Sequence, residues 1–479
     1  MPKPDARSEQ PQTGGEKPQA HGLPLRVKFG YGGAEGAGSL IWTVFYTFFL
    51  YYLTDVVKMG AGAAGFVVMA GSIWQALLTA PVGLWSDTRR WRWGRRRPFL
   101  LATAVPYAII TWLMFTDLRL SPGWRFVYYL AAVIVYFTIF TLEDVPYTAL
   151  AAEMTQDYDE RTSLVTYRTA WSQVVTIVGA AVPLALAGVL AGPFGSDRAG
   201  WSAMGAVMGA CCVLPILLTW RTTRNFELFP EKTETRWWEM FRAALQNRTF
   251  RYTMAIYAVS YVGINLLMAV AVYYLKYVMH YGDNVSSLAL LVFVVAGTAW
   301  LPLINLAARR RGKRWALALF MIIWVVSMAG IVPMGPHTAV LFWLLLLIAP
   351  AGGVAATLLT WAMIPDCTEV DEFKTGQRRE GLYYGIATFA QQGAVALTLW
   401  LIGAYLGWIG YHADMPQSHG ALLGIKLLFG AGTGLFALVT LVLALRLPLT
   451  REKHAALRAA IRLRQEGKEA DSSAFADVL

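Results

Sequence analysis

Twelve runs of mostly apolar residues, each long enough to cross a lipid bilayer, constrain this sequence more than any motif does. A helix of about 20 residues spans the roughly 30 Å hydrocarbon layer of a membrane. Hydrophobic residues make up 56% of the chain and charged residues only 15%, so much of the apolar surface must face lipid. The sequence therefore predicts an all-α polytopic membrane protein with transmembrane helices at 27–53, 61–85, 99–117, 126–150, 166–192, 202–220, 252–279, 287–307, 315–333, 338–363, 383–409 and 421–446.

The positions of the cations predict which side of the membrane each connection faces. Six arginines follow the second apolar run and five cations follow the eighth: Arg89, Arg90, Arg92, Arg95, Arg96 and Arg97, then Arg309, Arg310, Arg311, Lys313 and Arg314. Connections rich in Lys and Arg stay in the cytoplasm. With twelve spans both termini are then cytoplasmic, and we expect a multi-pass protein of the cytoplasmic (inner) membrane. This placement accounts for the net charge of +11, and the sequence contains no basic fold module of a nucleic-acid-binding protein.

The spans divide the chain into two halves with flanking tails. The predicted organisation is a disordered cytoplasmic tail at 1–26, an N-terminal six-helix bundle at 27–220, a cytoplasmic linker at 221–251, a C-terminal six-helix bundle at 252–446 and a cytoplasmic tail at 447–479. Within the last tail, Leu449–Gly467 has the pattern of a basic amphipathic helix. Such a helix lies on the membrane surface or is solvated, and the sequence leaves both alternatives open.

Two pairs of segments indicate that one half duplicates the other. Pro81–Leu100 and Pro302–Phe320 both run from an apolar helix through a basic turn into the next helix, and Glu153 and Asp366 each begin a charged segment between a fourth and a fifth span. We interpret these charged segments as a gate that breaks and reforms as two bundles rock. The alternative is topogenic charge on solvated loops. The predicted gating residues are Asp157, Asp159, Glu160, Arg161, Asp371, Glu372, Arg378, Arg379 and Glu380.

The sequence offers no disulfide framework, metal centre or enzyme motif. Cys211 and Cys212 are adjacent inside an apolar run, and Cys367 lies on the predicted cytoplasmic side, so we expect reduced structural thiols. No cysteine or histidine pair has the spacing of a metal site, and the HExxH, nucleotide-loop and GxSxG motifs are absent. We therefore expect no enzymatic activity, no metal and no cofactor.

Four segments resemble one known family. They read FGYGGAEGAGSLIWTVFYTFFLYYLTDVV, RWGRRRPFLL, EDVPYTALAAEMTQDYDERTSLVTYR and MIPDCTEVDEFKTGQRREGLYYG. From about Phe29 to Tyr411 the chain resembles the glycoside-pentoside-hexuronide:cation symporters, the melibiose permease branch of the major facilitator superfamily. This resemblance implies two pseudo-symmetric six-helix bundles around a central cavity, with a sugar bound at mid-membrane.

Some binding positions of that family are retained and others are lost. Asp144 matches the family aspartate that binds sugar hydroxyls, and Arg168 matches its arginine partner. A carboxylate accepts hydrogen bonds from hydroxyls and a guanidinium donates several, which suits a polyol. The alternative is a structural ion pair between neighbouring helices. Gly38 and Ser39 stand where the sugar permease has a lysine and an aspartate, and Gln392 replaces a lysine.

Aromatic residues add candidates for stacking on a sugar ring. Trp361, Trp74 and Trp171 lie near segments that match the family's binding helices, although a lipid-facing position is the alternative for each. The predicted substrate-binding residues are therefore Asp144, Arg168, Gln392, Ser39 and Trp361.

The family's cation-binding carboxylates are missing from the second span. IWQALLTAP offers Gln75 and Thr79 there, and Thr141 adds an oxygen from the fourth span. Neutral oxygens alone make a weak sodium site. Glu35 in the first span and Glu143 in the fourth are possible replacement acids, because burial favours the protonated form of a carboxyl group. An interfacial role for Glu35 is the alternative, and the sequence leaves coupling to a proton, to sodium or to neither open.

These observations predict a secondary active transporter of a sugar, glycoside or acidic sugar that works by alternating access. A lysophospholipid or other amphipathic solute is the alternative substrate, because the lost polar positions leave a more apolar cavity and an animal branch similar to this family carries lysophospholipids. A non-transporting membrane sensor is a more distant alternative. The expected partners are a small-molecule solute and membrane lipid, without nucleic acid, and we expect a monomer.

Overall fold

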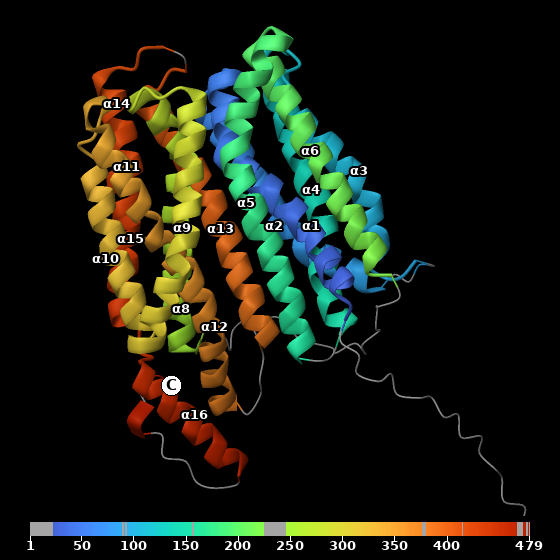
Figure 1. The fold of residues 1–479 in the computed structure, drawn as a ribbon, viewed down its shortest axis with the longest axis vertical. Helices are drawn as coiled ribbons and strands as arrows, with labels where there is room; N and C mark the ends of the chain where they lie inside the picture. Colours follow the sequence, from blue (N-terminus) through green and yellow to red (C-terminus); the bar gives the residue numbers. More distant parts are fainter. Residues whose placement is uncertain are drawn as a thin grey trace, which may run out of the picture.

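The computed structural model describes residues 23–88, 91, 93–155, 158–224, 246–375, 380–413, 415–466, 473–475 and 478, and this part of the chain is built from helices (Figure 1). The first half contains α1 (Leu25–Val44), η1 (Phe45–Phe49), η2 (Tyr52–Val56), α2 (Ala61–Thr88), α3 (Arg97–Met114), α4 (Pro122–Met154), α5 (Tyr158–Phe194) and α6 (Asp197–Thr222). The second half contains α8 (Arg248–Tyr273), η3 (Tyr274–Val278), α9 (Asp283–Arg311), α10 (Lys313–Ile331), η4 (Pro336–Thr338), α11 (Ala339–Ile348), α12 (Pro350–Thr375), α13 (Glu380–Trp408), α14 (His419–Lys426), η5 (Leu427–Gly432) and α15 (Thr433–Arg446). The helix α16 (Arg451–Gln465) and the short η6 (Ser473–Phe475) follow.

Eleven helices of the described chain are long and apolar enough to cross a membrane, and they coincide with the second to twelfth predicted spans. The first predicted span, 27–53, is helical as well but is not among the eleven. α1 contains Lys28, Glu35 and several glycines, which weaken its apolar character, and its continuation is wound as two π-helical segments. The prediction of an all-helical, multi-pass membrane protein is confirmed.

Several helices extend past the apolar spans predicted for them. α4 continues to Met154 and α5 begins at Tyr158, so the charged segment that follows the fourth span is largely helical. In the second half α12 likewise continues to Thr375. Hydropathy identifies the part of a helix that contacts lipid, whereas backbone hydrogen bonding continues into the polar region beyond it.

The helices of each half pack mainly with one another. α1 contacts α5 and α6, and α3 contacts α6; in the second half α8 contacts α12, α13 and α15. The most extensive contacts between the halves join α2 to α13 and α5 to α9, which lie along the middle of the molecule in Figure 1. Each joins the second membrane helix of one half to the fifth of the other, as expected for two related bundles.

Both halves repeat one polar arrangement at the end of the molecule where α3 and α10 begin, here called the basic end. Arg97, at the start of α3, donates hydrogen bonds of 3.0 and 2.7 Å to the carbonyl of Trp220 in α6. Arg314, at the start of α10, donates in the same way to the carbonyl of Leu445 in α15. Since these are the third and sixth membrane helices of each half, the duplication extends to single hydrogen bonds.

Ion pairs between the basic turns and the fourth membrane helices also recur. Arg95 and Arg96 each lie 2.5 Å from Glu153, near the end of α4. Lys313 lies 2.7 Å from Asp366, on α12. A buried carboxylate is tolerated when a cation pairs with it. The predicted equivalence of Glu153 and Asp366 is therefore confirmed by their contacts.

The basic helix predicted at 449–467 exists as α16, and its apolar side packs on the protein. Its apolar residues Leu457 and Ala460 are buried against Val370 and Phe373 of α12. Arg464 donates a 2.7 Å hydrogen bond to the carbonyl of Phe373. The apolar stripe that suggested a membrane-surface helix is covered instead by the end of α12, which projects beyond its apolar span.

Candidate functional site

A cavity of about 740 Å³ lies between the two halves. The first half lines it with residues of α1, α2, α4 and α5, and the second half with residues of α8, α12 and α13. All ten residues predicted to bind substrate or a coupling ion lie in this lining: Glu35, Ser39, Gln75, Thr79, Thr141, Glu143, Asp144, Arg168, Trp361 and Gln392. We call it the central cavity; its volume is typical of sites for small molecules.

The arginine of the central cavity is bonded to a carboxylate of α1. Arg168 Nε lies 2.5 Å from Glu35 Oε2. Ser39, one turn further along α1, donates a 3.3 Å hydrogen bond to Glu35 Oε1, and its hydroxyl lies 2.7 Å from that of Ser172 on α5. Glu35 is therefore part of the cavity, not an interfacial residue.

In this structure Arg168 is bonded to Glu35 and not to Asp144, and the joint role of Asp144 and Arg168 in binding stays a prediction. Among the described residues no ion pair joins Asp144 to Arg168. The Arg168 guanidinium lies 5.7 Å from the ring centre of Tyr147, which follows Asp144 on α4 by about one turn. α1 and α5 pack closely, because Gly32 and Gly36 of α1 face the Trp171 side chain of α5. This close packing places Glu35 within reach of Arg168.

Glu143 is the most buried acid of the cavity. It is 1% exposed, and its Oε1 atom has no hydrogen-bond partner among the described residues. It faces α1 at Gly38, where an added Cβ would lie 3.9 Å from Glu143 Oε2. A charged carboxylate in such a place is costly without a bonded cation, so the neutral form is favoured.

Three neutral groups predicted from the sequence also lie in the first-half wall. Gln75 Oε1 is buried without a partner in the described chain. Thr79 donates to the carbonyl of Gln75 over 2.9 Å, and Thr141 donates to the carbonyl of Phe137 over 2.6 Å. The hydroxyl protons of both threonines are thus held by their own helices, while their lone pairs are available as acceptors.

The second half contributes an aromatic wall. Trp361 of α12 is stacked on Tyr384 of α13, with ring centres 5.6 Å apart and planes 21° apart. Tyr261, Thr388 and Gln391 line the cavity beside them, and neither these three residues nor Tyr384 were predicted from the sequence. On α13 the residues at 384, 388, 391 and 392 recur at helical spacing, which is the signal that would have found them.

The two other tryptophans singled out from the sequence lie outside the cavity lining. Trp74 donates a 2.9 Å hydrogen bond to Thr138, and so joins α2 to α4. Trp171 donates a 3.0 Å hydrogen bond to the carbonyl of Phe29 on α1. Their contacts are those of helix packing, and Trp361 alone of the three faces the cavity.

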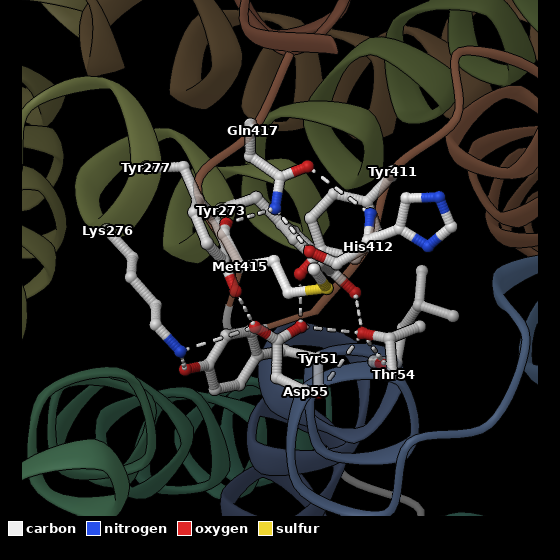
Figure 2. Close-up of polar contacts among 11 residues, drawn as sticks. Tyr51, Thr54, Asp55, Tyr273, Lys276, Tyr277, Tyr411, His412, Met415 and Gln417 are labelled. Atoms are coloured by element: carbon white, nitrogen blue, oxygen red, sulfur yellow. Dashed lines mark hydrogen bonds and ion pairs between the residues drawn. The ribbon is translucent and has the colours of Figure 1, made fainter.

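The halves are joined at the end opposite the basic end by the carboxylate of Asp55, in η2 (Figure 2). Tyr277 and Tyr411 donate hydrogen bonds of 2.5 and 2.6 Å to it, and Lys276 Nζ lies 3.3 Å away. All three partners belong to the second half, and Asp55 is 2% exposed. We call these four residues the Asp55 cluster.

The Asp55 cluster is completed by hydroxyl groups and was not predicted. Thr54 Oγ1 lies 2.8 Å both from Asp55 Oδ2 and from the hydroxyl of Tyr273. Burial, together with the Asp55 charge, raises the pKa of the Tyr411 hydroxyl well above its ordinary value, so Tyr411 remains a donor. One acid at the end of an apolar span is not distinguishable by sequence from an ordinary loop charge.

The predicted gating residues are described only in part. Asp157, Arg378 and Arg379, and the side chains of Asp159, Arg161 and Glu380, lie outside the described residues. Glu160 pairs with Lys28 of α1 at 3.0 Å and accepts a 2.9 Å hydrogen bond from the backbone of Leu23. Asp371 is buried and Glu372 is half-buried near the end of α12. Their role as a gate stays a prediction.

The chain is similar in sequence to bacterial symporters and sugar transporters. The chain is 28% identical over 425 residues to the uncharacterized symporter YnaJ of Bacillus subtilis, covering 88% of this chain and 90% of that protein. It is 24% identical to the isoprimeverose transporter of Lactiplantibacillus pentosus, covering 85% of each.

Solved structures share the fold. A bacterial homologue of the human lysosomal transporter Spinster superposes with a TM-score of 0.65 at 13% identity, over 90% of this chain and 97% of that one. The family model described as MFS/sugar transport protein matches residues 30–451. This match covers most of the chain and confirms the resemblance found in the sequence: the chain belongs to the MFS/sugar transport protein family.

Proposed function

We propose that this protein is a secondary active transporter that moves a neutral sugar or glycoside across the cytoplasmic membrane by alternating access. The observation that carries the proposal is the composition of the central cavity, in which a wall of carboxylates, hydroxyls and one arginine faces the stacked pair Trp361 and Tyr384. Hydroxyl groups of a sugar exchange hydrogen bonds with the first wall, while aromatic rings pack on the apolar faces of a pyranose.

The charges of the cavity favour a neutral solute over an acidic sugar. The formally charged residues of the described lining are Glu35, Glu143, Asp144 and Arg168. The arginine is already bonded to Glu35, so a carboxylate or sulfonate on the solute would meet Asp144 without a spare cation. The similarity to an isoprimeverose transporter also supports a glycoside substrate.

The polar lining counts against an amphipathic lipid as substrate. An acyl chain needs a continuous apolar wall, whereas the polar and charged residues of this lining come from helices of both halves, among them Gln75, Gln391 and Gln392. No specific contact favours a sensor over a transporter either, so we carry neither alternative further.

We propose a proton as the coupling ion and Glu143 as its carrier. Glu143 is buried beside the cavity without a bonded cation, and its neutral form is favoured for that reason. Gln75, Thr79 and Thr141 supply only neutral oxygens, which make a weak sodium site. We also propose that the basic end faces the cytoplasm, since the arginines and lysines of the connections gather there.

Counterflow of radiolabelled solutes in proteoliposomes tests which class of solute the protein transports. The panel pairs neutral sugars and glycosides with uronic acids and with a lysophospholipid. We expect exchange of at least one neutral member, and its loss in Asp144→Asn, because the neutral amide cannot replace a carboxylate that accepts two hydroxyl hydrogen bonds. Trp74→Phe, which lies outside the cavity lining, is the matched control and should exchange normally. Exchange of uronic acids alone, or of the lysophospholipid alone, would contradict the proposal.

A further inference from the structure

A second cavity, of about 360 Å³, lies within the second half at the basic end. Its walls are formed by α8, α9, the start of α10, α12, the connection from α15 to α16 and the start of α16. No described residue lines both this cavity and the central cavity. The transport mechanism does not use it, so its lining needs a separate explanation.

The charge of this lining is strongly positive. It contains four cations and one carboxylate: Arg309, Lys313, Arg314, Arg451 and Asp366. Asp366 is bonded to Lys313 at 2.7 and 2.8 Å, so one positive charge is compensated. Arg314 and Arg451 donate to backbone carbonyls, which carry no net charge. The cavity therefore attracts an anion.

Two polar side chains at the rim have no partner within the described chain. Asn305 and Arg309 lie one turn apart on α9, line the cavity and are exposed. None of the described residues forms a side-chain hydrogen bond or ion pair with either of them. A polar side chain within a membrane span is unfavourable unless it is paired, and Asn305 lies within α9.

Most of the remaining lining is apolar, apart from Thr249, Thr253, Thr450 and His454. Leu358, Leu359 and Met363 of α12 face Leu447 and Leu449 from the connection to α16. The adjoining outer surface of α9 is apolar too, with Leu303 and Leu306 51% and 43% exposed. An anionic group held at the rim would thus have hydrocarbon surface next to it, along the membrane-facing side of α9.

We propose that this cavity binds the phosphate headgroup of an anionic phospholipid, whose acyl chains lie along α9. Arg309 and Arg451 contact the phosphate oxygens, and Asn305 contacts the glycerol or ester oxygens below them. Guanidinium groups suit phosphate because they donate in a planar fork. Basic pockets between membrane helices are known to take lipid headgroups of this kind. The site is independent of the proposed transport function.

Thermal unfolding of the purified full chain in detergent tests the proposal. Phosphatidylglycerol, phosphatidylcholine and inorganic phosphate are added separately. A ligand that binds the folded protein raises its unfolding temperature by mass action. We expect phosphatidylglycerol to raise it and phosphatidylcholine to do so much less. Arg309→Gln should need about tenfold more phosphatidylglycerol for the same rise in unfolding temperature, since one charge-assisted hydrogen bond is lost.

Arg310→Gln is the matched control. It removes the same charge one residue away, and the Arg310 side chain is not part of the lining, so it should respond as the unchanged protein does. Asn305→Leu serves as a second variant if Arg309→Gln does not fold. Protection by inorganic phosphate with the same dependence on Arg309 would support the anion site and identify a soluble ligand as its source. Equal responses of Arg309→Gln and Arg310→Gln, or no response to any anion, would overturn the proposal.

Discussion

The described lining of the central cavity contains one arginine and three acids, and the arginine is bonded to only one of them. Arg168 is bonded to Glu35, so Asp144 keeps its lone pairs for another donor. A solute hydroxyl that donates to Asp144 and accepts from Arg168 would have to compete with Glu35 for the guanidinium. Substrate binding is therefore expected to loosen a contact between α1 and α5, two helices of the same half.

Glu35→Gln is expected to destabilise the protein more than Asp144→Asn. The first change leaves Arg168 without its bonded carboxylate, while the second removes an acid to which no described cation is bonded. Breaking a fully buried ion pair costs about 3–5 kcal/mol. The side chains of Glu35 and Arg168 are 18% and 31% exposed, so their pair is only partly buried. We therefore expect Glu35→Gln to lower the free energy of unfolding by a smaller amount, about 1–2 kcal/mol. Thermal unfolding of the two variants side by side is the measurement, and a larger loss for Asp144→Asn would show that the pairing described here does not stabilise the fold.

Glu143→Gln is expected to separate exchange from accumulation. The amide has the size of the neutral acid but cannot release a proton, so counterflow should continue while accumulation driven by an imposed proton gradient is lost. Asp144→Asn should abolish both, which distinguishes a proton carrier from a substrate ligand. Accumulation by Glu143→Gln in a pH gradient, with sodium balanced, would rule this residue out as the carrier.

At the scale of helices, α1 is held to its neighbours by small residues and one inserted hydroxyl. Thr219 of α6 accepts a 2.8 Å hydrogen bond from the backbone of Ala34 and donates one of 2.7 Å to the carbonyl of Gly30. An added Cβ on Gly33 would lie 2.6 Å from the carbonyl oxygen of Pro215, so the backbones are already in close contact. These contacts fix the rotation of α1, and with it the direction of Glu35.

Thr219→Val is expected to lower the free energy of unfolding by about 1–3 kcal/mol, because it leaves a buried N–H and a buried carbonyl of α1 without their partner. Thr111→Val is the matched control. Thr111 is equally buried, but its hydroxyl donates only to the carbonyl of Tyr107 on its own helix. Its loss should cost less than about 1 kcal/mol. Equal losses in thermal unfolding would mean that the inserted hydroxyl does not support α1.

The sequence was sufficient to predict most of the helices that line the cavity and ten of the lining residues, but not the contribution of α8 or how the residues pair. Apolar runs and motif positions place Asp144, Arg168 and Trp361 on known helices. The bond between Arg168 and Glu35 depends on how closely α1 approaches α5, which is set by contacts such as Trp171 with Gly32. The docking of α16 was not predictable either, because the covering surface of α12 is distant in sequence.

At the scale of the whole molecule, the described residues include a polar cluster that joins the two halves at the end opposite the basic end. The Asp55 cluster joins them there through two hydroxyl donors and one lysine. At the basic end the described pairs of Arg95 with Glu153 and of Lys313 with Asp366 each join residues of one half. Such pairs persist when the halves rotate, whereas the Asp55 cluster has to break before that end can open.

Asp55→Asn is expected to favour forms of the protein that are open at the end opposite the basic end. Hydrogen bonds to a charged group contribute about 1.5–3 kcal/mol each, so weakening them should shift the equilibrium between forms about tenfold or more. Spin labels at Trp124→Cys and Val340→Cys, exposed residues of different halves, would report a longer distance; the exposed Cys211 is first replaced by serine. Asp117→Asn is the matched control, because Asp117 pairs at 3.0 Å with Arg198 of its own half. A distance distribution that changes equally in both variants, or in neither, would mean that the Asp55 cluster does not hold the halves together.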